Sequence, residues 1–143
     1  MRLSLVAAGN EGTRRPRYPA AYPQVLGVGA LDQDGRAYRR SNSGLSVSVA
    51  APGVEVLSTT PPEGFSFADG TSIAAAHVSG VLAVLVSAGV EPLAARDALL
   101  EIVAPRPNAE LAERGGSRDP RAIDGLRLSP ICDVFGVLGR SCN

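Results

Sequence analysis

The sequence predicts an α/β fold with a largely parallel sheet. Short apolar segments of strand character alternate with segments of helical character, which is the pattern of layered α/β proteins. Residues 24–30 are nearly all apolar, as expected of a strand that is buried on both faces of a parallel sheet. Residues 73–88 are mostly small or apolar and include no proline, which predicts a buried helix.

The remaining elements follow from turn and breaker residues. Gly-Asn-Glu-Gly at 9–12, Asn-Ser-Gly at 42–44 and Pro-Pro-Glu-Gly at 61–64 separate the extended segments. Pro92 favours the first turn of a second helix with one apolar side. We therefore expect extended segments at residues 2–8, 24–30, 46–50, 54–58 and 65–68, a helix with Ser72 in its first turn that runs to residue 88, and a helix over residues 92–103.

The amino-acid composition changes after Ala104, and we therefore divide the chain into residues 1–104 and 105–143. The second part is polar, with proline, glycine and arginine throughout, and we expect a surface loop over 105–121 and a short strand over 122–128. Two helices cover a parallel sheet poorly, because such a sheet needs helices on both faces. We therefore expect the first part to be the latter half of a larger domain, followed by a loop-rich C-terminal extension.

Composition and charge restrict the classes of function. The 143 residues are 45% apolar, and 14 arginines balance 14 acidic residues with no lysine present. This balance gives no reason to expect nucleic acid or an anionic membrane as a partner. We expect a soluble chain, since no segment reaches the roughly 20 apolar residues of a membrane span and the first apolar run is too short for a signal peptide. Cys132 and Cys142 could close a small loop in an oxidising compartment.

Residues 69–80 combine turn chemistry, a helix start and a candidate nucleophile. Gly70 permits a sharp turn, and Thr71 and Ser72 are residues that commonly begin helices. Taken alone, Ser72 is explained by a capping role at the start of the helix. The alternative is a nucleophilic serine, because unpaired N–H groups and the helix dipole favour negative charge beside an attacked carbonyl.

Four motifs in order resemble the subtilisin-like serine proteases, or subtilases. They are Val-Ala-Ala-Gly-Asn-Glu-Gly at 6–12, Tyr-Pro-Ala at 18–20 with Val-Leu-Gly-Val-Gly-Ala at 25–30, Ala-Pro-Gly-Val at 51–54 with Ser-Thr at 58–59, and Gly-Thr-Ser-Ile-Ala-Ala-Ala-His-Val-Ser-Gly at 70–80. Each motif alone is a modest signal, and their common order makes the set specific. The resemblance implies the subtilisin-like three-layer fold with a mostly parallel sheet, of which this chain holds only the C-terminal half.

The resemblance implies a role for each motif residue. Ser72 would attack the peptide carbonyl, with its own N–H and the side-chain amide of Asn10 as oxyanion donors. Without the family, Asn10 is equally explained as a left-handed turn residue after Gly9. Ala7, Ala8 and Gly9 would line the pocket for a substrate side chain. The implied function is a serine endopeptidase that hydrolyses peptide bonds through an acyl-enzyme, with a peptide or protein substrate as partner.

The sequence departs from the family pattern in two ways. Ala76 replaces the usual proline before the helix histidine, and Ile73 occupies a methionine-like position. The catalytic histidine and aspartate are not identifiable, because in the family both come from the half that precedes this segment. His77 follows Ser72 by five positions and so points about 140° away on a helix, as suits a structural histidine. Asp69 suits a turn-forming role.

The expected activity is therefore conditional. The chain would hydrolyse peptides only if an N-terminal half of the catalytic domain supplied the histidine and aspartate in cis or in trans, and alone we expect it to be inactive. The alternative is a truncated or degenerate subtilase fragment without catalysis, acting as a binding or structural module. The family often binds calcium, but no metal ligand set and no cofactor are identifiable here. A secreted or periplasmic location is implied by the family alone.

Arg17 raises a hypothesis about specificity. It precedes Tyr18 and Pro19, where the family tends to have a small residue near the floor of the pocket. A guanidinium there would favour acidic substrate side chains or block the pocket. The plainer explanation is an exposed loop arginine beside Arg14 and Arg15.

Overall fold

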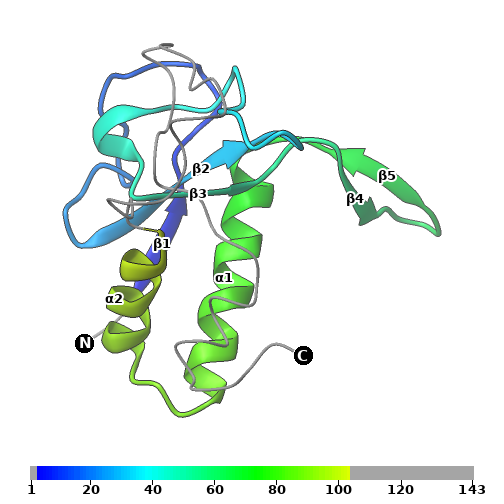
Figure 1. Cartoon of the computed structure of the whole chain (residues 1–143). Helices are drawn as coiled ribbons and strands as arrows, with labels where there is room; N and C mark the ends of the chain where they lie inside the picture. The colour runs from blue at the N-terminus through cyan, green and yellow to red at the C-terminus, as the bar shows by residue number, and fades with distance from the viewer. Residues whose placement is uncertain (1–2, 104–143) are drawn as a thin grey trace.

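The computed structural model describes residues 3–103, which form two sheets, two α-helices and a short 3₁₀ helix (Figure 1). The prediction of an α/β fold with a mostly parallel sheet is confirmed. The expected surface loop, the expected strand over 122–128 and both cysteines lie outside the described residues. The elements are β1 (Ser4–Ala7), β2 (Val25–Leu31), η1 (Gly44–Ser46), β3 (Val49–Pro52), β4 (Val56–Thr59), β5 (Phe65–Ala68), α1 (Thr71–Ser87) and α2 (Pro92–Val103).

The larger sheet has three parallel strands in the order β1, β2, β3. Val6 lies opposite Gly27 across the first pair, and Val28 lies opposite Val49 across the second. The central strand β2 is buried from Leu26 to its end, as its continuous apolar composition predicts. The segments that join these three strands contain no α-helix, so the helices that cover the sheet come from the second half of the described chain.

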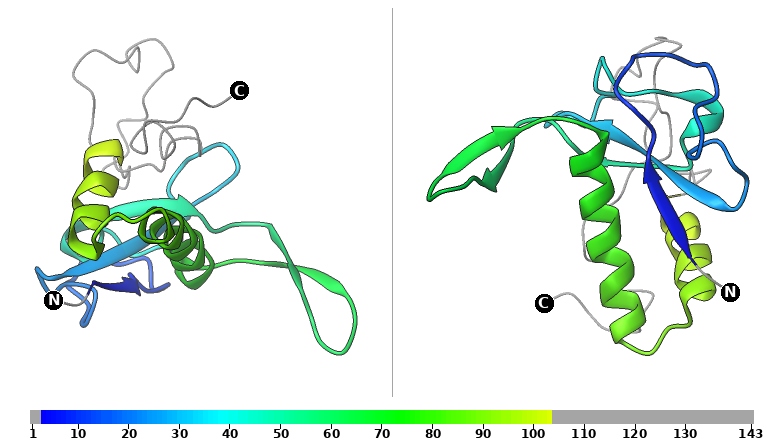
Figure 2. Two further views of the ribbon diagram at one scale, coloured as in Figure 1. Left: turned by 90° about the horizontal axis from the view of Figure 1, so that it is seen from below. Right: turned by 180° about the vertical axis from the view of Figure 1, so that it is seen from behind.

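Helix α1 packs along the parallel sheet and also contacts α2 (Figures 1 and 2). Its buried residues repeat every three or four positions, as expected of one helix face: Thr71, Ala74, Val78, Leu82 and Leu85. The predicted buried helix is buried on this face, whereas Val84 and Val86 on another face are 38% and 41% exposed. Within residues 3–103 the main elements that contact α1 are the three strands of the parallel sheet and α2. Neither described helix is long and apolar enough to cross a membrane.

The third strand begins later than the sequence pattern predicts. Instead of a strand over residues 46–50, the chain forms η1 and then β3. Ser46 and Ser48 do not point to alternate faces of a strand there. Their hydroxyls instead accept hydrogen bonds from backbone N–H groups of other segments. The hydroxyl of Ser46, which is buried, accepts the backbone N–H of Arg17 at 2.9 Å, and the hydroxyl of Ser48 accepts that of Gly27 at 3.3 Å.

Strands β4 and β5 form an antiparallel hairpin that projects away from the rest of the fold (Figures 1 and 2). Leu57 pairs with Phe67, and Thr59 pairs with Phe65, so these four side chains share one face of the ribbon. Leu57, Phe65 and Phe67 are 59%, 74% and 70% exposed. The hairpin returns the chain directly to the start of α1.

Replacing Gly53 with alanine is expected to destabilise the fold by about 1–3 kcal/mol through overpacking. A Cβ on Gly53 would lie 2.7 Å from the carbonyl oxygen of Gly70 and 2.9 Å from the Cβ of Ala30, so the start of α1 would have to move. The free energy of unfolding in urea measures the effect. Gly80→Ala is the matched control, because a Cβ there meets nothing within 4 Å and alanine raises helix propensity. Equal stability of the two variants would contradict the prediction.

Candidate active site

The carboxyl end of β1 and the amino end of α1 lie side by side, which is also visible in the right view of Figure 2. The backbone N–H of Thr71 donates to Oδ1 of Asn10 at 2.9 Å. In return, the backbone N–H of Gly9 donates to the hydroxyl of Thr71 at 3.1 Å. Thr71 is fully buried, so this pair of bonds joins the loop after β1 to the helix start. Two segments 61 residues apart in the sequence thus form one site.

Gly70, not Ser72, is the N-cap residue of α1, and no side chain caps the helix. The capping explanation of Ser72 is therefore wrong, because the serine lies inside the first turn. Its side chain is exposed, and neither its hydroxyl nor its backbone N–H bonds to a described residue. Gly70 has a φ of 143°, a conformation that favours glycine and lets the chain enter the helix without a side chain over the site.

The polar atoms of Asn10 and Ser72 converge around Gly70. The position that a Cβ atom on Gly70 would occupy lies 3.4 Å from Nδ2 of Asn10 and 3.5 Å from the hydroxyl oxygen of Ser72. Oδ1 of Asn10 lies 3.6 Å from the same point, and because this oxygen accepts from Thr71, the amide nitrogen is the group of Asn10 left to donate there. The arrangement presents one hydroxyl, the side-chain amide of Asn10 and the backbone N–H of Ser72, which bonds to no described residue, whereas the N–H groups of Thr71, Ile73 and Ala74 have partners. Such a set suits a reaction in which negative charge develops on an oxygen.

Asn42 holds the loop that carries Asn10, and the sequence analysis missed this role. Its buried amide donates to the carbonyl of Ala8 at 2.8 Å and to the carboxylate of Glu11 at 2.6 Å. Its Oδ1 accepts the backbone N–H groups of Glu11 at 3.2 Å and Thr13 at 3.1 Å. Gly9 has a φ of 104°, and a Cβ there would lie 2.5 Å from the amide nitrogen of Asn42. Glycine is thus needed at position 9 for both conformation and space.

A cavity of about 220 Å³ adjoins the loop after β1. The three residues predicted to line a substrate pocket, Ala7, Ala8 and Gly9, all line it, and so does Arg17, for which we raised a role in specificity. The full lining is Ala7, Ala8, Gly9, Glu11, Arg17, Tyr18 and Ala20. Residues 7–9 are small, so this part of the cavity wall carries no large side chain.

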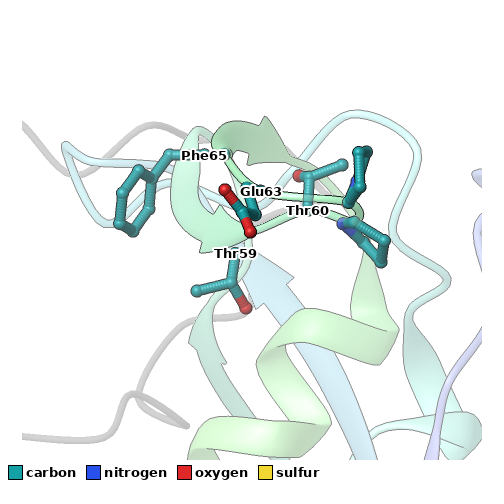
Figure 3. Close-up of a pocket in the computed structure, with 7 residues that line it drawn as sticks. Thr59, Thr60, Glu63 and Phe65 are labelled. Atoms are coloured by element: carbon teal, nitrogen blue, oxygen red, sulfur yellow. The ribbon is translucent and has the colours of Figure 1, made fainter.

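A second hollow, of about 400 Å³, lies at the tip of the β4–β5 hairpin (Figure 3). It is lined only by residues 59–65, which include Thr59, Glu63 and Phe65. No residue of the helix start or of the loop after β1 contributes to it. The smaller cavity adjoins the site, because Gly9 and Glu11 in its lining flank Asn10, while Asn10 and Ser72 themselves are not part of that lining.

His77 and Asp69 take part in local contacts rather than in the site. The Nδ1 atom of His77 lies 3.1 Å from the carbonyl oxygen of Ile73, one turn back on α1, and the ring is exposed. Asp69 accepts the backbone N–H of Glu55 at 2.7 Å and so fixes a residue with a φ of 53°. Among residues 3–103, no group of three or more histidines, cysteines or carboxylates is placed to hold a metal ion.

Comparison with known proteins bears on the four motifs. A family model described as the Subtilase family matches residues 1–105. The chain belongs to the subtilase family. The matched residues include the loop after β1, the cavity lining and the start of α1, so the whole candidate site lies inside the family match.

Several proteases resemble the chain over more than half of its length. A thermophilic serine proteinase from Bacillus sp. (strain AK1) is 41% identical over 66% of this chain, and thermitase from Thermoactinomyces vulgaris is 41% identical over 59%. The structure of the prenylagaramide maturation protease PagA matches with a TM-score of 0.73 and 30% identity over 94% of this chain. This chain spans 24% and 30% of the two curated relatives and 50% of PagA. It therefore corresponds to part of a subtilase, with an α/β fold of the same type.

Proposed function

We propose that this chain is the nucleophile and oxyanion-binding half of a subtilisin-type serine endopeptidase. The observation that carries the proposal is the convergence of the Ser72 hydroxyl and the Asn10 amide around Gly70, at the amino end of α1. The substrate would be a peptide or protein, and the product of the first step would be an acyl-enzyme on Ser72.

In the proposed reaction, each residue of the site has a separate role. The hydroxyl oxygen of Ser72 attacks the peptide carbonyl, and the carbonyl oxygen becomes an oxyanion. That oxygen accepts hydrogen bonds from the backbone N–H of Ser72 and from Nδ2 of Asn10, which carries no charge and so favours the oxyanion over the neutral carbonyl. Ala7, Ala8 and Gly9 line the cavity that receives the substrate side chain. The amine then leaves, and water releases the acyl group in a second step.

A base is needed to take the proton from Ser72. The sequence contains one histidine, His77, and its ring contacts the carbonyl of Ile73 on the same helix. We therefore propose that the histidine base and its orienting aspartate come from an N-terminal half of the catalytic domain, joined in cis or bound in trans. This half is the principal protein partner of the chain.

Labelling of Ser72 by a fluorophosphonate tests this proposal. We expect slow labelling of the chain alone and a rate about 10²–10⁴-fold higher once the N-terminal half is present, because a positioned general base contributes that factor. The N-terminal half is supplied from a relative such as thermitase, or from a longer gene product if one is found. Ser72→Ala should abolish labelling, and Ser79→Ala, at another exposed serine of α1, should leave it unchanged.

Two outcomes would count against the proposal in different ways. Rapid labelling of Ser72 in the chain alone would show that no further half is needed. Slow labelling that the N-terminal half does not accelerate would favour the second candidate function, a truncated subtilase fragment that acts as a binding or structural module. The exposed apolar face of the β4–β5 hairpin favours that second candidate, since such a surface is typical of binding.

A further inference from the structure

We propose that the cavity beside the site selects an acidic side chain of the peptide substrate, and that Arg17 is the residue that binds its carboxylate. The proposal rests on the proposed function, since it names the substrate class of that same site. At about 220 Å³ the cavity is smaller than the roughly 300–1,000 Å³ of typical small-molecule sites, so it fits a single side chain. Arg17 and Glu11 are the charged residues in its lining.

The backbone of Arg17 is held in place from both sides. Its N–H donates to the hydroxyl of the buried Ser46 at 2.9 Å, and its carbonyl accepts the N–H of Ala21 at 2.8 Å. The side chain, in contrast, is 56% exposed and lies at the cavity. A fixed backbone with an accessible guanidinium is a suitable arrangement for recognising a carboxylate, because the fork of N–H donors matches its two oxygens.

Glu11 is bound by Asn42 and forms an ion pair with Arg17 that leaves the guanidinium N–H donors open. Its Oε2 atom accepts from the amide of Asn42 at 2.6 Å, and its backbone N–H donates to the same side chain. The distance from that oxygen to Nε of Arg17 is 3.9 Å, which is an ion pair without a hydrogen bond. A basic substrate side chain would have to compete with Asn42 and Arg17 for Glu11. An acidic one would meet guanidinium donors that bond to no described residue.

The surroundings of the cavity add positive charge. The backbone carbonyl of Arg40 accepts the N–H of Gly12 at 2.9 Å, and its Nε lies 3.5 Å from the carbonyl of Asn10, which places this arginine at the loop after β1. Arg39 precedes it, and Arg14 and Arg15 lie on the segment that leads to Arg17. The summed field of such a group attracts acidic peptide segments to the cavity.

Peptide binding to the Ser72→Ala chain tests the proposal without catalysis. The probes are acetyl-Ala-Ala-Glu-amide, its glutamine analogue of the same shape and its lysine analogue, with binding measured by NMR titration. We expect the glutamate peptide to bind at least about tenfold more tightly than the glutamine peptide at low salt. The advantage should shrink at about 1 M salt, where the Debye length falls to roughly 3 Å.

Two variants with the same change in charge locate the effect. Arg17→Gln should remove the preference for glutamate, and Arg36→Gln should keep it, because Arg36 pairs with Asp34 in a turn that does not line the cavity. Equal binding of the glutamate and glutamine peptides, or tighter binding of the lysine peptide, would overturn the proposal. So would a glutamate preference that survives Arg17→Gln.

Hydrolysis by the chain completed with its N-terminal half separates this proposal from the proposed function. Cleavage after glutamate with kcat/KM at least about tenfold above cleavage after glutamine would support both. Cleavage without that preference would overturn the role of Arg17 and leave the protease function standing. A glutamate preference in binding with no hydrolysis of any peptide would support the role of Arg17 and count against the protease function.

Discussion

Asn10→Ala is expected to lower kcat about 10²–10³-fold in the chain completed by its N-terminal half, which is the loss known for one oxyanion donor in subtilisin, a member of the same family. The amide nitrogen of Asn10 and the Ser72 hydroxyl both lie near Gly70, where we propose that the oxyanion forms. KM should change little, because the neutral carbonyl of the substrate needs this donor far less than the oxyanion does. Steady-state hydrolysis of a peptide nitroanilide measures both constants.

The structure also supplies a variant that separates catalysis from folding. Asn10→Ala removes the acceptor for the Thr71 N–H as well, which costs about 1 kcal/mol of stability. Asn10→Asp keeps that acceptor and places negative charge at the helix start, so its unfolding free energy should equal or exceed that of the parent. It nevertheless loses the N–H donor, and kcat should fall at least as far. Parental kcat in Asn10→Asp would exclude Asn10 as an oxyanion donor.

The sequence predicts best those strands and helices whose position is determined by their own residues. The continuous apolar run of β2 and the proline at the start of α2 place those elements closely, because burial and backbone restriction act on the residues themselves. The start of β3 is different. The alternation at residues 46–50 resembles a strand, whereas the serine side chains there bind backbone N–H groups of Arg17 and Gly27, about twenty to thirty residues away. Nothing local reveals such partners.

The residues of the candidate site likewise include some that the sequence reveals and one that it does not. Ser72 and Asn10 are found from the sequence because each belongs to a motif, and the structure brings their polar atoms together around Gly70. Asn42 stands in an Asn-Ser-Gly segment that reads as an ordinary turn. Its side-chain partners lie 29 to 34 residues away, so its role appears only when the fold is known. The sequence shows only an asparagine within a turn segment, and its burial appears in the structure alone.

Asn42→Ala is expected to destabilise the chain by about 3 kcal/mol or more, the second of the two largest effects. The substitution leaves the carbonyl of Ala8 and the N–H groups of Glu11 and Thr13 without their present partner, in a part-buried setting. It also removes the amide that holds the Glu11 carboxylate. Urea unfolding measures the loss. Ser43→Ala is the control, since the neighbouring side chain makes no capping hydrogen bond and should change stability by less than about 0.5 kcal/mol.

The same substitution should affect substrate binding more than turnover. The backbone N–H of residue 42 still donates to the carbonyl of Gly9, at 2.9 Å in the parent, so the segment next to Asn10 keeps one anchor. Ala8 and Glu11, which line the cavity, lose theirs. In the completed enzyme we therefore expect Asn42→Ala to raise KM and to lower kcat less than Asn10→Ala does. A fall in kcat as large as that of Asn10→Ala, at unchanged KM, would mean that Asn42 positions the oxyanion donor rather than the cavity wall.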